Sequence, residues 1–541
     1  MPRSDDRDGY LRGGRALVTV GGNPSRRKWC GVNWDEEVDV LVAGSGGGLC
    51  GAYTAAREGL SVTVVEATDK FGGTTSYSGG GGLWFPCNPV LRRAGVDDTL
   101  DDALTYFRAV VGDRTPADLQ ETYVRRGGEV IEYLEQDESF SFEVYPWPDY
   151  FGTAPKARLD GKRHIVPTPL PADRLGALSD SVRGPLATDR LGAKQPRTLI
   201  GGRALIGRFL LGLSKYPNAS LRLNTVLDEL IVEDGAVTGA VVEQQGVRTA
   251  IRARRGIILA AGGFEGNEEL RVRYGVPGTA RDTMGPWGNV GRAHEAAIAI
   301  GADTDLMDQA WWSPGMIHPD GRAAFALWFT GGLFVNQDGV RFVDESAPYD
   351  RVGREIIEQM RSGATTLPYW MIYDDTHGIV PPVQATNVPT VEPEKYEAAG
   401  LWHTADTLEQ LAARIGVPGA ALAATVARFN ELAARGRDED FGRGDEAYDR
   451  AFSDGESPLV PLGEGPYHAA AFGISDLGTK GGLRTDVAAR VLTASGEPIR
   501  GLYAAGNTMA AVSGTVYPGG GNPIGASVLF SHLAAVDLVG R

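Results

Sequence analysis

The sequence predicts an α/β fold in which a Rossmann-like dinucleotide-binding domain, built from both ends of the chain, carries an inserted α+β cap domain. A glycine-rich segment near the N-terminus, 39–67, reads as a strand, a tight turn, a helix and a second strand. A second glycine-rich segment, 501–527, closes the chain. The stretch between them is richer in aromatic clusters. At 541 residues the chain is too long for one core, which favours two interleaved domains.

The N-terminal segment has the pattern of a βαβ unit that holds a dinucleotide pyrophosphate. Gly44 and Gly46 are normally spaced, but Leu49 takes the place of the third glycine, so a turn shortened by one residue makes Gly48 that glycine. An acidic residue ends the second strand, where a ribose hydroxyl needs an acceptor. A merely flexible glycine loop is the alternative. The pattern predicts cofactor contacts at Gly44, Ser45, Gly46, Gly47, Gly48 and Glu66.

Composition narrows the classes of function. The formal net charge of -16, without a basic stripe, argues against a nucleic-acid partner. The 3 cysteines lack metal-ligand spacing, so no metal site is expected and a reducing cytosol fits. No apolar run looks long enough to span a bilayer. Residues 1–33 carry mixed charge around one short apolar stretch and are expected to form a poorly ordered extension.

Two further segments look like parts of the cofactor domain, which we expect to comprise 34–306 and 479–541. In 71–86, small and hydroxyl residues would let the backbone approach a flat ring, although an ordinary Gly/Ser loop has the same composition. A buried strand is expected at 256–264 and an amphipathic helix at 289–303. The candidate contacts here are Gly73, Thr74, Thr75, Ser78, Gly79, Gly80, Ala261 and Gly262.

The inserted segment, 307–478, has the character of a cap over a large apolar ligand. It contains Trp311, Trp312, Phe325, Trp328 and Phe329, followed by a charged helical stretch at 404–436. Most of these aromatic residues could equally form the core of the cap itself. We expect Phe325 to line the substrate pocket.

The C-terminal segment reads as the second lobe of a flavin site. Asn522 is a natural N-cap and Pro523 a natural first helical residue. The positive end of this helix could stabilise a flavin that has accepted hydride, although a capped surface helix is the alternative. Tyr517 and the glycines after Pro518 place a phenol beside backbone amides, which can hold a carbonyl oxygen as charge develops on it. Further cofactor contacts are expected at Gly506, Asn507, Asn522, Pro523 and Ile524.

From about Trp34 to Arg541 the chain resembles the bacterial 3-ketosteroid Δ1-dehydrogenases, which are related to the flavin subunits of fumarate reductase and succinate dehydrogenase. The resemblance rests on these motifs: FGGTTSYSGGGGLWFP, VYPWPDYF, DQAWWSPG, DESAPYDR, TKGGLRTD and SGTVYPGGGNP. It implies a Rossmann-like FAD-binding domain, a catalytic cap, and 1,2-dehydrogenation of 3-ketosteroids in steroid degradation.

The resemblance also implies roles for four residues. Tyr517 and the amide of Gly521 bind the C3 carbonyl, Tyr349 takes the C2 proton, and Tyr150 supports that base, while hydride leaves C1 for flavin N5. A phenol titrates near 10 in water, so Tyr349 can act as a base only where neighbours favour its phenolate. Nearby carboxylates could repel that phenolate or serve as bases themselves: Asp344, Glu345 and Asp350.

Rival functions come from three classes. A fumarate reductase-like enzyme needs arginine and histidine around a dicarboxylate, and SGTVYPGGG contains neither. A 3-ketosteroid 4,5-dehydrogenase uses similar chemistry and stays open. A non-catalytic flavin-binding protein is the third class.

Partners and location follow from the same reading. FAD is expected to be non-covalent, because the early cradle offers no histidine for attachment. Without a second, nicotinamide-binding fingerprint, electrons are expected to pass to a quinone or another acceptor. The expected location is cytoplasmic, with loose membrane association left open.

Overall fold

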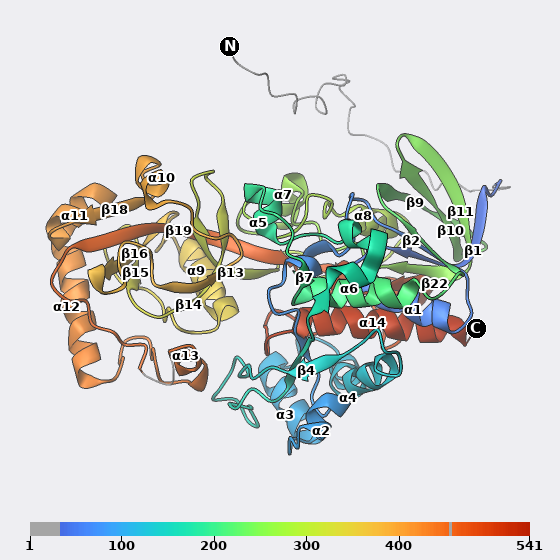
Figure 1. The fold of residues 1–541 in the computed structure, drawn as a ribbon, viewed down its shortest axis with the longest axis horizontal. Helices are drawn as coiled ribbons and strands as arrows, with labels where there is room; N and C mark the ends of the chain where they lie inside the picture. The colour runs from blue at the N-terminus through green and yellow to red at the C-terminus, as the bar shows by residue number, and fades with distance from the viewer. Residues whose placement is uncertain (1–32, 454–456, 541) are drawn as a thin grey trace, which may run out of the picture.

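The protein is described by a computed structural model covering residues 33–453 and 457–540. The N-terminal extension expected at 1–33, with Cys30, lies outside the described residues apart from Asn33. Figure 1 shows two lobes side by side along the long axis of the molecule, joined by the long strand β19 (Tyr467–Thr479). The larger lobe carries a mixed parallel and antiparallel sheet and the smaller lobe an antiparallel one, each with helices, which confirms the predicted α/β class.

The larger lobe is built on an 8-stranded sheet in which β8, β2, β1, β11 and β22 run parallel. One edge of β11 pairs with β1, and the other edge has two partners: the first half pairs antiparallel with β10 and the last residues pair parallel with β22. The strands are β1 (Glu36–Ala43), β2 (Val62–Val65), β8 (Ala219–Arg222), β9 (Thr225–Glu233), β10 (Ala236–Gln244), β11 (Val247–Leu259), β21 (Arg490–Leu492) and β22 (Pro498–Ala504).

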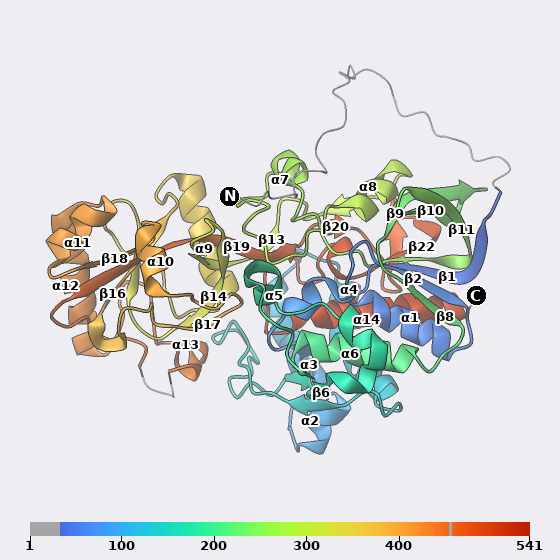
Figure 2. The ribbon, with the colours of Figure 1, turned by 45° about the horizontal axis from the view of Figure 1, so that its top comes forward.

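Two buried helices, α1 (Gly48–Arg57) and α14 (Asn522–Val539), cover one face of this sheet, and a third, α6 (Gly202–Leu213), packs against α1. Figure 2 shows α14, the last element of the chain, lying along α1, the first helix. Their contact places the N-terminal ends of both helices at the same edge of the sheet. The predicted βαβ unit is confirmed as β1, α1 and β2, with the helix beginning at Gly48.

A helical layer packs against α14 on its other side. It contains α2 (Pro89–Arg93), α3 (Leu100–Val111) and α4 (Ala117–Leu134), together with the 3-stranded sheet of β3 (Leu83–Trp84), β5 (His164–Pro167) and β4 (Phe142–Val144). The remaining elements of this lobe are η1 (Gly73–Tyr77), β6 (Leu170–Pro171), η2 (Ala172–Ser181), α5 (Leu186–Leu191), β7 (Thr198–Leu199), α7 (Glu268–Tyr274), α8 (Arg292–Ala299), β12 (Thr304–Asp305), β20 (Gly482–Leu483) and η4 (Gly506–Thr508).

The smaller lobe is a 7-stranded sheet with helices on its faces. Its strands are β13 (Ala310–Ile317), β14 (Ala323–Phe329), β15 (Leu333–Val335), β16 (Tyr369–Asp374), β17 (Val383–Thr386), β18 (Trp402–Ala405) and β19. Its helical elements are α9 (Tyr349–Ser362), η3 (Asp375–His377), α10 (Pro393–Ala398), α11 (Leu408–Ile415), α12 (Gly419–Arg435) and α13 (Ala447–Ala451).

Three local predictions need correction. The helix expected at 289–303 is only Arg292–Ala299, because Gly291 at φ 83 interrupts the chain before it. The helical stretch expected at 404–436 begins in strand β18 and then divides at Gly416, with φ 75, into α11 and α12. In α14, the N-cap is Gly521 at φ 88, and Asn522 is already helical with its side chain buried and no capping hydrogen bond.

Helix α14 also bears on the expectation that no segment is long enough to cross a membrane. Its 18 residues, Asn522–Val539, with a mean hydropathy of 1.3, meet that requirement by length and composition. However, 61% of this window is buried inside the protein, where α14 packs against α1, α4 and β11. That packing is typical of a core helix.

Candidate active site

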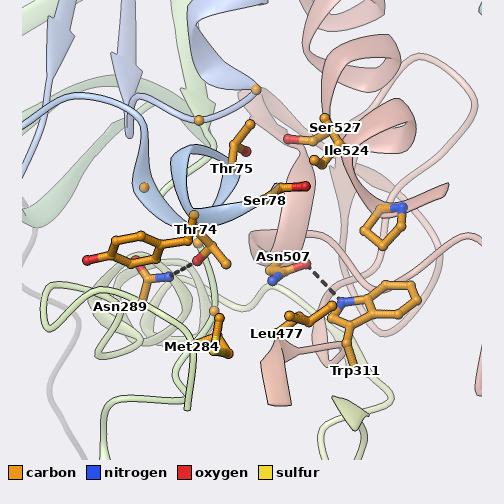
Figure 3. A pocket seen from close by; sticks show the side chains of 18 of the residues that line it. Thr74, Thr75, Ser78, Met284, Asn289, Trp311, Leu477, Asn507, Ile524 and Ser527 are labelled. Atoms are coloured by element: carbon orange, nitrogen blue, oxygen red, sulfur yellow. Dashed lines mark hydrogen bonds between the residues drawn. The ribbon is translucent and has the colours of Figure 1, made fainter. Parts of the chain in front are cut away.

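A cavity of about 910 Å³ opens where the N-terminal segment, the cap and the C-terminal segment meet. Figure 3 shows its side chains arriving from all three parts of the chain. Most of the residues predicted from the sequence line it: Gly44, Ser45, Gly46, Gly47, Glu66, Gly73, Thr74, Thr75, Ser78, Gly79, Gly80, Tyr150, Ala261, Gly262, Phe325, Tyr349, Gly506, Asn507, Tyr517, Gly521, Pro523 and Ile524.

Two predicted contacts do not line this cavity. Gly48 faces the sheet instead: a Cβ there would lie 3.0 Å from Val42 Cγ1 and 3.1 Å from the Ala260 Cβ. It therefore permits close packing of helix and strand, which is the usual role of a third glycine. The Asn522 side chain turns away into the protein, and both its polar atoms are buried with no hydrogen-bond partner in the described part of the chain.

The glycine turn and Glu66 form one end of the cavity. Gly44 has φ +100, and a Cβ there would lie 2.1 Å from the Ala260 carbonyl oxygen, so the turn requires glycine. Ser45 Oγ donates to Glu66 Oε2 at 2.5 Å, and the backbone N–H and hydroxyl of Thr68 donate to Glu66 Oε1. These bonds hold the carboxylate at the cavity wall and leave it room for about one further donor.

Hydrogen bonds across the middle of the cavity join parts of the chain that the sequence reading treated separately. Asn289 Nδ2 donates to Thr74 Oγ1 at 3.0 Å (Figure 3). It also donates to the buried Glu265 Oε1 at 2.6 Å. Trp311 Nε1 donates to Asn507 Oδ1 at 3.1 Å (Figure 3). The sequence reading missed Asn289 and Glu265 as site residues, although the segments that carry both had been assigned to the cofactor domain.

These residues fit a bound dinucleotide with a flat ring. The glycine turn exposes backbone at the N-terminus of α1, and Gly520, Gly521 and Ile524 expose backbone at the N-terminus of α14. Between the two ends, Gly79 and Gly80 leave open space in which a Cβ would have almost no neighbours. Thr74, Thr75 and Ser78 supply hydroxyl groups along the same wall. The cavity thus has one end suited to the nucleotide, a middle lined by hydroxyl groups, and the N-terminus of α14 at the far end.

The three tyrosines predicted to do chemistry lie in one cluster at the far end. The ring centroids of Tyr150 and Tyr349 are 5.6 Å apart, those of Tyr349 and Tyr517 are 5.6 Å apart, and those of Tyr150 and Tyr517 are 5.1 Å apart. Phe325, predicted to line the substrate pocket, packs edge to face on Tyr349 at 4.8 Å. Four segments distant in sequence therefore meet at one site.

Backbone hydrogen bonds lock the loops that carry these tyrosines. The Tyr150 N–H donates to the Pro518 carbonyl at 3.0 Å, and Asp149 forms an isolated bridge with Gly519. The Asp149 carboxylate accepts from Trp84 Nε1 and from Arg163 Nη1, both at 2.8 Å. The loop that carries Tyr150 is therefore fixed against the glycine loop after Tyr517.

The electrostatics of Tyr517 fit the proposed carbonyl site. Burial raises the pKa of Tyr517 to about 12, while the Tyr349 hydroxyl and the Gly521 backbone N–H act in the opposite direction. The Gly521 N–H therefore lies close to the Tyr517 hydroxyl, and both residues line the cavity. At neutral pH the phenol keeps its proton and is a donor.

The electrostatics of Tyr349 differ from the expectation that Tyr150 favours its phenolate. Burial raises the pKa of Tyr349 well above the usual range, and the neighbouring Tyr150 and Tyr517 phenols raise it further. Tyr150 Oη is buried and makes no regular hydrogen bond within the described residues. In this arrangement Tyr349 is protonated at neutral pH.

The carboxylates close to Tyr349 in sequence do not compete for the role of base. Asp344, Glu345 and Asp350 are all absent from the described cavity lining. Glu345 is fully buried and paired with Arg341 and Arg443 at 2.8 and 3.1 Å. Asp350 pairs with Lys480 at 3.3 Å.

The basic side chains in the described lining do not form an anion site. Burial lowers the pKa of His164 and of His294 to about 4, so both rings are neutral at pH 7. Arg292 is 57% exposed and lies 3.6 Å from Asp228. These properties suit an uncharged ligand better than a dicarboxylate.

The cap aromatics divide between core and cavity. Trp312 and Phe329 belong to the hydrophobic core of the cap, whereas Trp311, Phe325 and Trp328 line the cavity. The sequence reading missed the lining residue Trp147 and also Tyr448, whose ring packs on Tyr150 at 5.2 Å. Nothing in the local sequence around Tyr448 distinguishes it from an ordinary core residue.

Comparison with known proteins agrees with this site. Residues 39–524 match the protein family described as "FAD binding domain". The chain is 37% identical to the 3-oxosteroid 1-dehydrogenase of Mycobacterium tuberculosis, covering 93% of this chain and 98% of that protein. It is 34% identical to the 4-oxocyclohexanecarboxylate 2-dehydrogenase of Sinomonas cyclohexanicum, covering 93% of both proteins.

A solved structure gives the same relationship in three dimensions. The 3-ketosteroid Δ1-dehydrogenase of Sterolibacterium denitrificans, crystallised with 1,4-androstadiene-3,17-dione, matches with a TM-score of 0.85 and 32% identity, over 93% of this chain and 100% of that one. The expected resemblance and the expected cofactor, FAD, are confirmed. The chain belongs to the FAD-binding domain family and, within it, to the family of the 3-oxosteroid 1-dehydrogenases.

Proposed function

We propose that this chain is an FAD-dependent dehydrogenase that introduces the 1,2 double bond into 3-ketosteroids. The observation that carries the proposal is the meeting of the Tyr517 phenol and the Gly521 amide at the cavity wall, beside Tyr349. Two neighbouring donors on the wall of the cavity, next to a possible base, are what the enolisation of a ketone requires. The family relationship supports the same reaction.

In this proposal the Tyr517 hydroxyl and the Gly521 N–H donate hydrogen bonds to the C3 carbonyl oxygen. A hydrogen on the neighbouring carbon becomes acidic only when the developing enolate is stabilised, and donors held in advance do this without reorganisation. The tight turn keeps the amide in place, because Gly521 has φ 88 and lies against the Gly82 backbone. The negative charge that forms on the carbonyl oxygen also lies near the positive end of α14.

Tyr349 takes the C2 proton in the proposed reaction, and Tyr150 supports it. The raised pKa of Tyr349 means that only a small fraction is ionised near neutral pH, while each ionised molecule carries a strong base. Tyr150 Oη, without a partner in this structure, is free to donate to the phenolate once the site rearranges around a ligand. A bound FAD would supply the acceptor for the hydride that leaves C1.

The contacts that would hold the non-covalent FAD come from both parts of the cofactor domain. Glu66 suits the ribose, and the turn from Gly44 to Gly47 suits the pyrophosphate. Thr74, Thr75, Ser78 and Asn507 suit the ring system. We propose the same division of the chain as the sequence suggested, with 307–478 acting as the cap over the substrate. A quinone or another acceptor would reoxidise the flavin, and a cytoplasmic location fits the reduced cysteines Cys50 and Cys87.

Two other reactions are separated by the chemistry of the site. A fumarate reductase-like role requires cationic side chains for a dicarboxylate, and the histidines at this cavity are neutral. A 3-ketosteroid 4,5-dehydrogenase could use the same carbonyl donors, so the position of the double bond in the product distinguishes the two reactions. The Sinomonas relative is named for a monocyclic keto acid, but the aromatic walls formed by Trp147, Trp311 and Trp328 favour a larger apolar ketone.

The test is an anaerobic reaction of the purified yellow protein with 4-androstene-3,17-dione. We expect the flavin to bleach and the product to be 1,4-androstadiene-3,17-dione. The saturated 3-ketosteroid and 4-oxocyclohexanecarboxylate serve as parallel substrates. A product desaturated only at 4,5 from the saturated steroid, or turnover of the monocyclic acid alone, would overturn the proposal.

A further inference from the structure

A buried lysine outside the cavity connects the two tyrosines on which the proposed function rests. Lys480 has a fully buried side chain. Its ammonium group donates to the Thr515 carbonyl at 2.8 Å and to the Val516 carbonyl at 3.3 Å, directly before Tyr517. It also donates to Asp350 Oδ1 at 3.3 Å, directly after Tyr349.

The same ammonium group lies over the ring of Trp311, 4.3 Å from its centroid. Trp311 packs edge to face against Tyr517 at 5.1 Å, and its Nε1 donates to Asn507. The cation therefore contacts the backbone before Tyr517, the carboxylate after Tyr349 and the aromatic side chain behind Tyr517. Cation–π contacts are strongest where the charge is removed from water, as it is here.

We propose that Lys480 is a positioning residue for the dehydrogenation, which sets the spacing of Tyr517 and Tyr349 and neutralises the Asp350 carboxylate next to them. This inference depends on the proposed function, because it assigns Lys480 a role through those two tyrosines. Lys480 contacts neither the cavity nor, on this account, the substrate.

The charges around this pair are few and can be named. From α9, Asp350 and Arg354 face Lys480, and Arg354 Nη1 donates to the same Thr515 carbonyl at 2.7 Å. Burial lowers the pKa of Lys480 to about 8, while Asp350 acts to keep it protonated. Asp350 Oδ2 is buried and has no hydrogen-bond partner among the residues that the structure describes. The carboxylate therefore depends on Lys480 for its compensation.

The position of Asp350 gives the pair its effect on the reaction. A negative charge beside the tyrosines opposes formation of a phenolate, and the Asp350 carboxylate adds to the effect of burial in raising the pKa of Tyr517. With Lys480 in place the pair is neutral overall. Removing the ammonium group leaves an uncompensated negative charge beside the tyrosines. Removing the carboxylate leaves an uncompensated positive charge there.

The two substitutions leave opposite charges beside the tyrosines, and this difference is the basis of the test. In flavin-loaded Lys480→Met, we expect kcat for 4-androstene-3,17-dione to fall about 100-fold with little change in KM, because the donors lose their alignment. The limb on which kcat rises with pH should move to higher pH. In Asp350→Asn the same limb should move to lower pH. The double variant should bring the limb back toward the wild-type position.

Arg443→Met is the matched control, because Arg443 is also fully buried in an ion pair, with Glu345 in the cap. It should lower the unfolding temperature and leave the limb in place. Wild-type turnover of the steroid, measured in the same series, tests the proposed function separately. If the wild type is active but Lys480→Met keeps both its kcat and its limb, or if both single variants move the limb in the same direction, the role assigned to Lys480 is wrong.

Discussion

Tyr349 and Tyr517 lie edge to face with their ring centroids 5.6 Å apart and an interplanar angle of 82°, although 167 residues separate them in the chain. The arrangement brings a donor and a possible base to neighbouring atoms of one ligand. Tyr517→Phe removes the hydroxyl and keeps the ring, so packing survives. We expect kcat to fall by about 10²–10³ with flavin retained. Steady-state rates and flavin absorbance measure this, and an unchanged kcat would remove Tyr517 from the carbonyl site.

The base has a separate signature in Tyr349→Phe, which should abolish turnover while flavin stays bound. Because burial raises the pKa of Tyr349 well above its usual range, the limb on which wild-type kcat rises with pH should lie in the alkaline range. Rates measured from neutral pH upward check this. Retained activity in the variant would assign the proton transfer to another group.

The sequence allowed good prediction of features that depend on local pattern. The βαβ unit, the glycine turn and the tyrosine motifs each lie within a short segment whose composition has one physical explanation, such as Gly44 at φ +100. The residue at which α14 begins was harder to predict. Asn522 is a good N-cap by type, but Gly521 takes the positive φ that closes the turn, and the helix starts one residue earlier.

Features that depend on packing between distant segments could not be predicted. Asn289 joins Thr74 to Glu265, and no local pattern marks it as a cavity residue. Tyr150 was expected to lower the pKa of Tyr349, but burial raises that pKa and Tyr150 raises it further. Burial of a side chain is a tertiary property, so its effect on a pKa is visible only in the fold.

Gly521 should tolerate no side chain. A Cβ there would lie 2.5 Å from the Gly82 carbonyl carbon, and the residue has φ +88. Gly521→Ala should therefore displace the amide and lower kcat about 100-fold or more. Gly496→Ala is the control, because Gly496 has φ +84 with nothing within 4 Å of the added atom. Comparable losses in both variants would trace the effect to backbone strain rather than to the carbonyl site.

Gly47 controls the packing of α1 against α14 beside the cavity. A Cβ there would lie 2.0 Å from Ser527 Oγ and 2.7 Å from the Ser527 carbonyl carbon. Gly47→Ala should separate the two helices, cost about 1–3 kcal/mol of stability and reduce the flavin bound per protein. Gly419→Ala, at the start of α12 with ordinary contact distances, is the control. Full flavin occupancy in Gly47→Ala would show that this contact does not shape the site.

Buried histidines should make the protein sensitive to acid. Burial lowers the pKa of each of these to about 4: His164, His294, His318 and His532. The unfolded chain binds protons at these rings below about pH 6.5, whereas the native state does not until about pH 4. Their contribution to the free energy of unfolding is therefore present above pH 6.5 and is lost as the pH falls toward 4.

His532→Gln isolates one of these contributions. Denaturant unfolding of the variant and the wild type, followed from pH 7 to 4.5, should give a shallower pH dependence for the variant, by at most about 1.4 kcal/mol per pH unit. Identical slopes would mean that His532 titrates normally in the folded protein.

The most direct measurement is a crystal structure of the flavin-loaded protein with 1,4-androstadiene-3,17-dione bound. We predict that the C3 carbonyl oxygen lies about 2.7–3.1 Å from both Tyr517 Oη and the Gly521 nitrogen, with C2 facing Tyr349 Oη. A complex in which that oxygen contacts neither donor would contradict the account of this site.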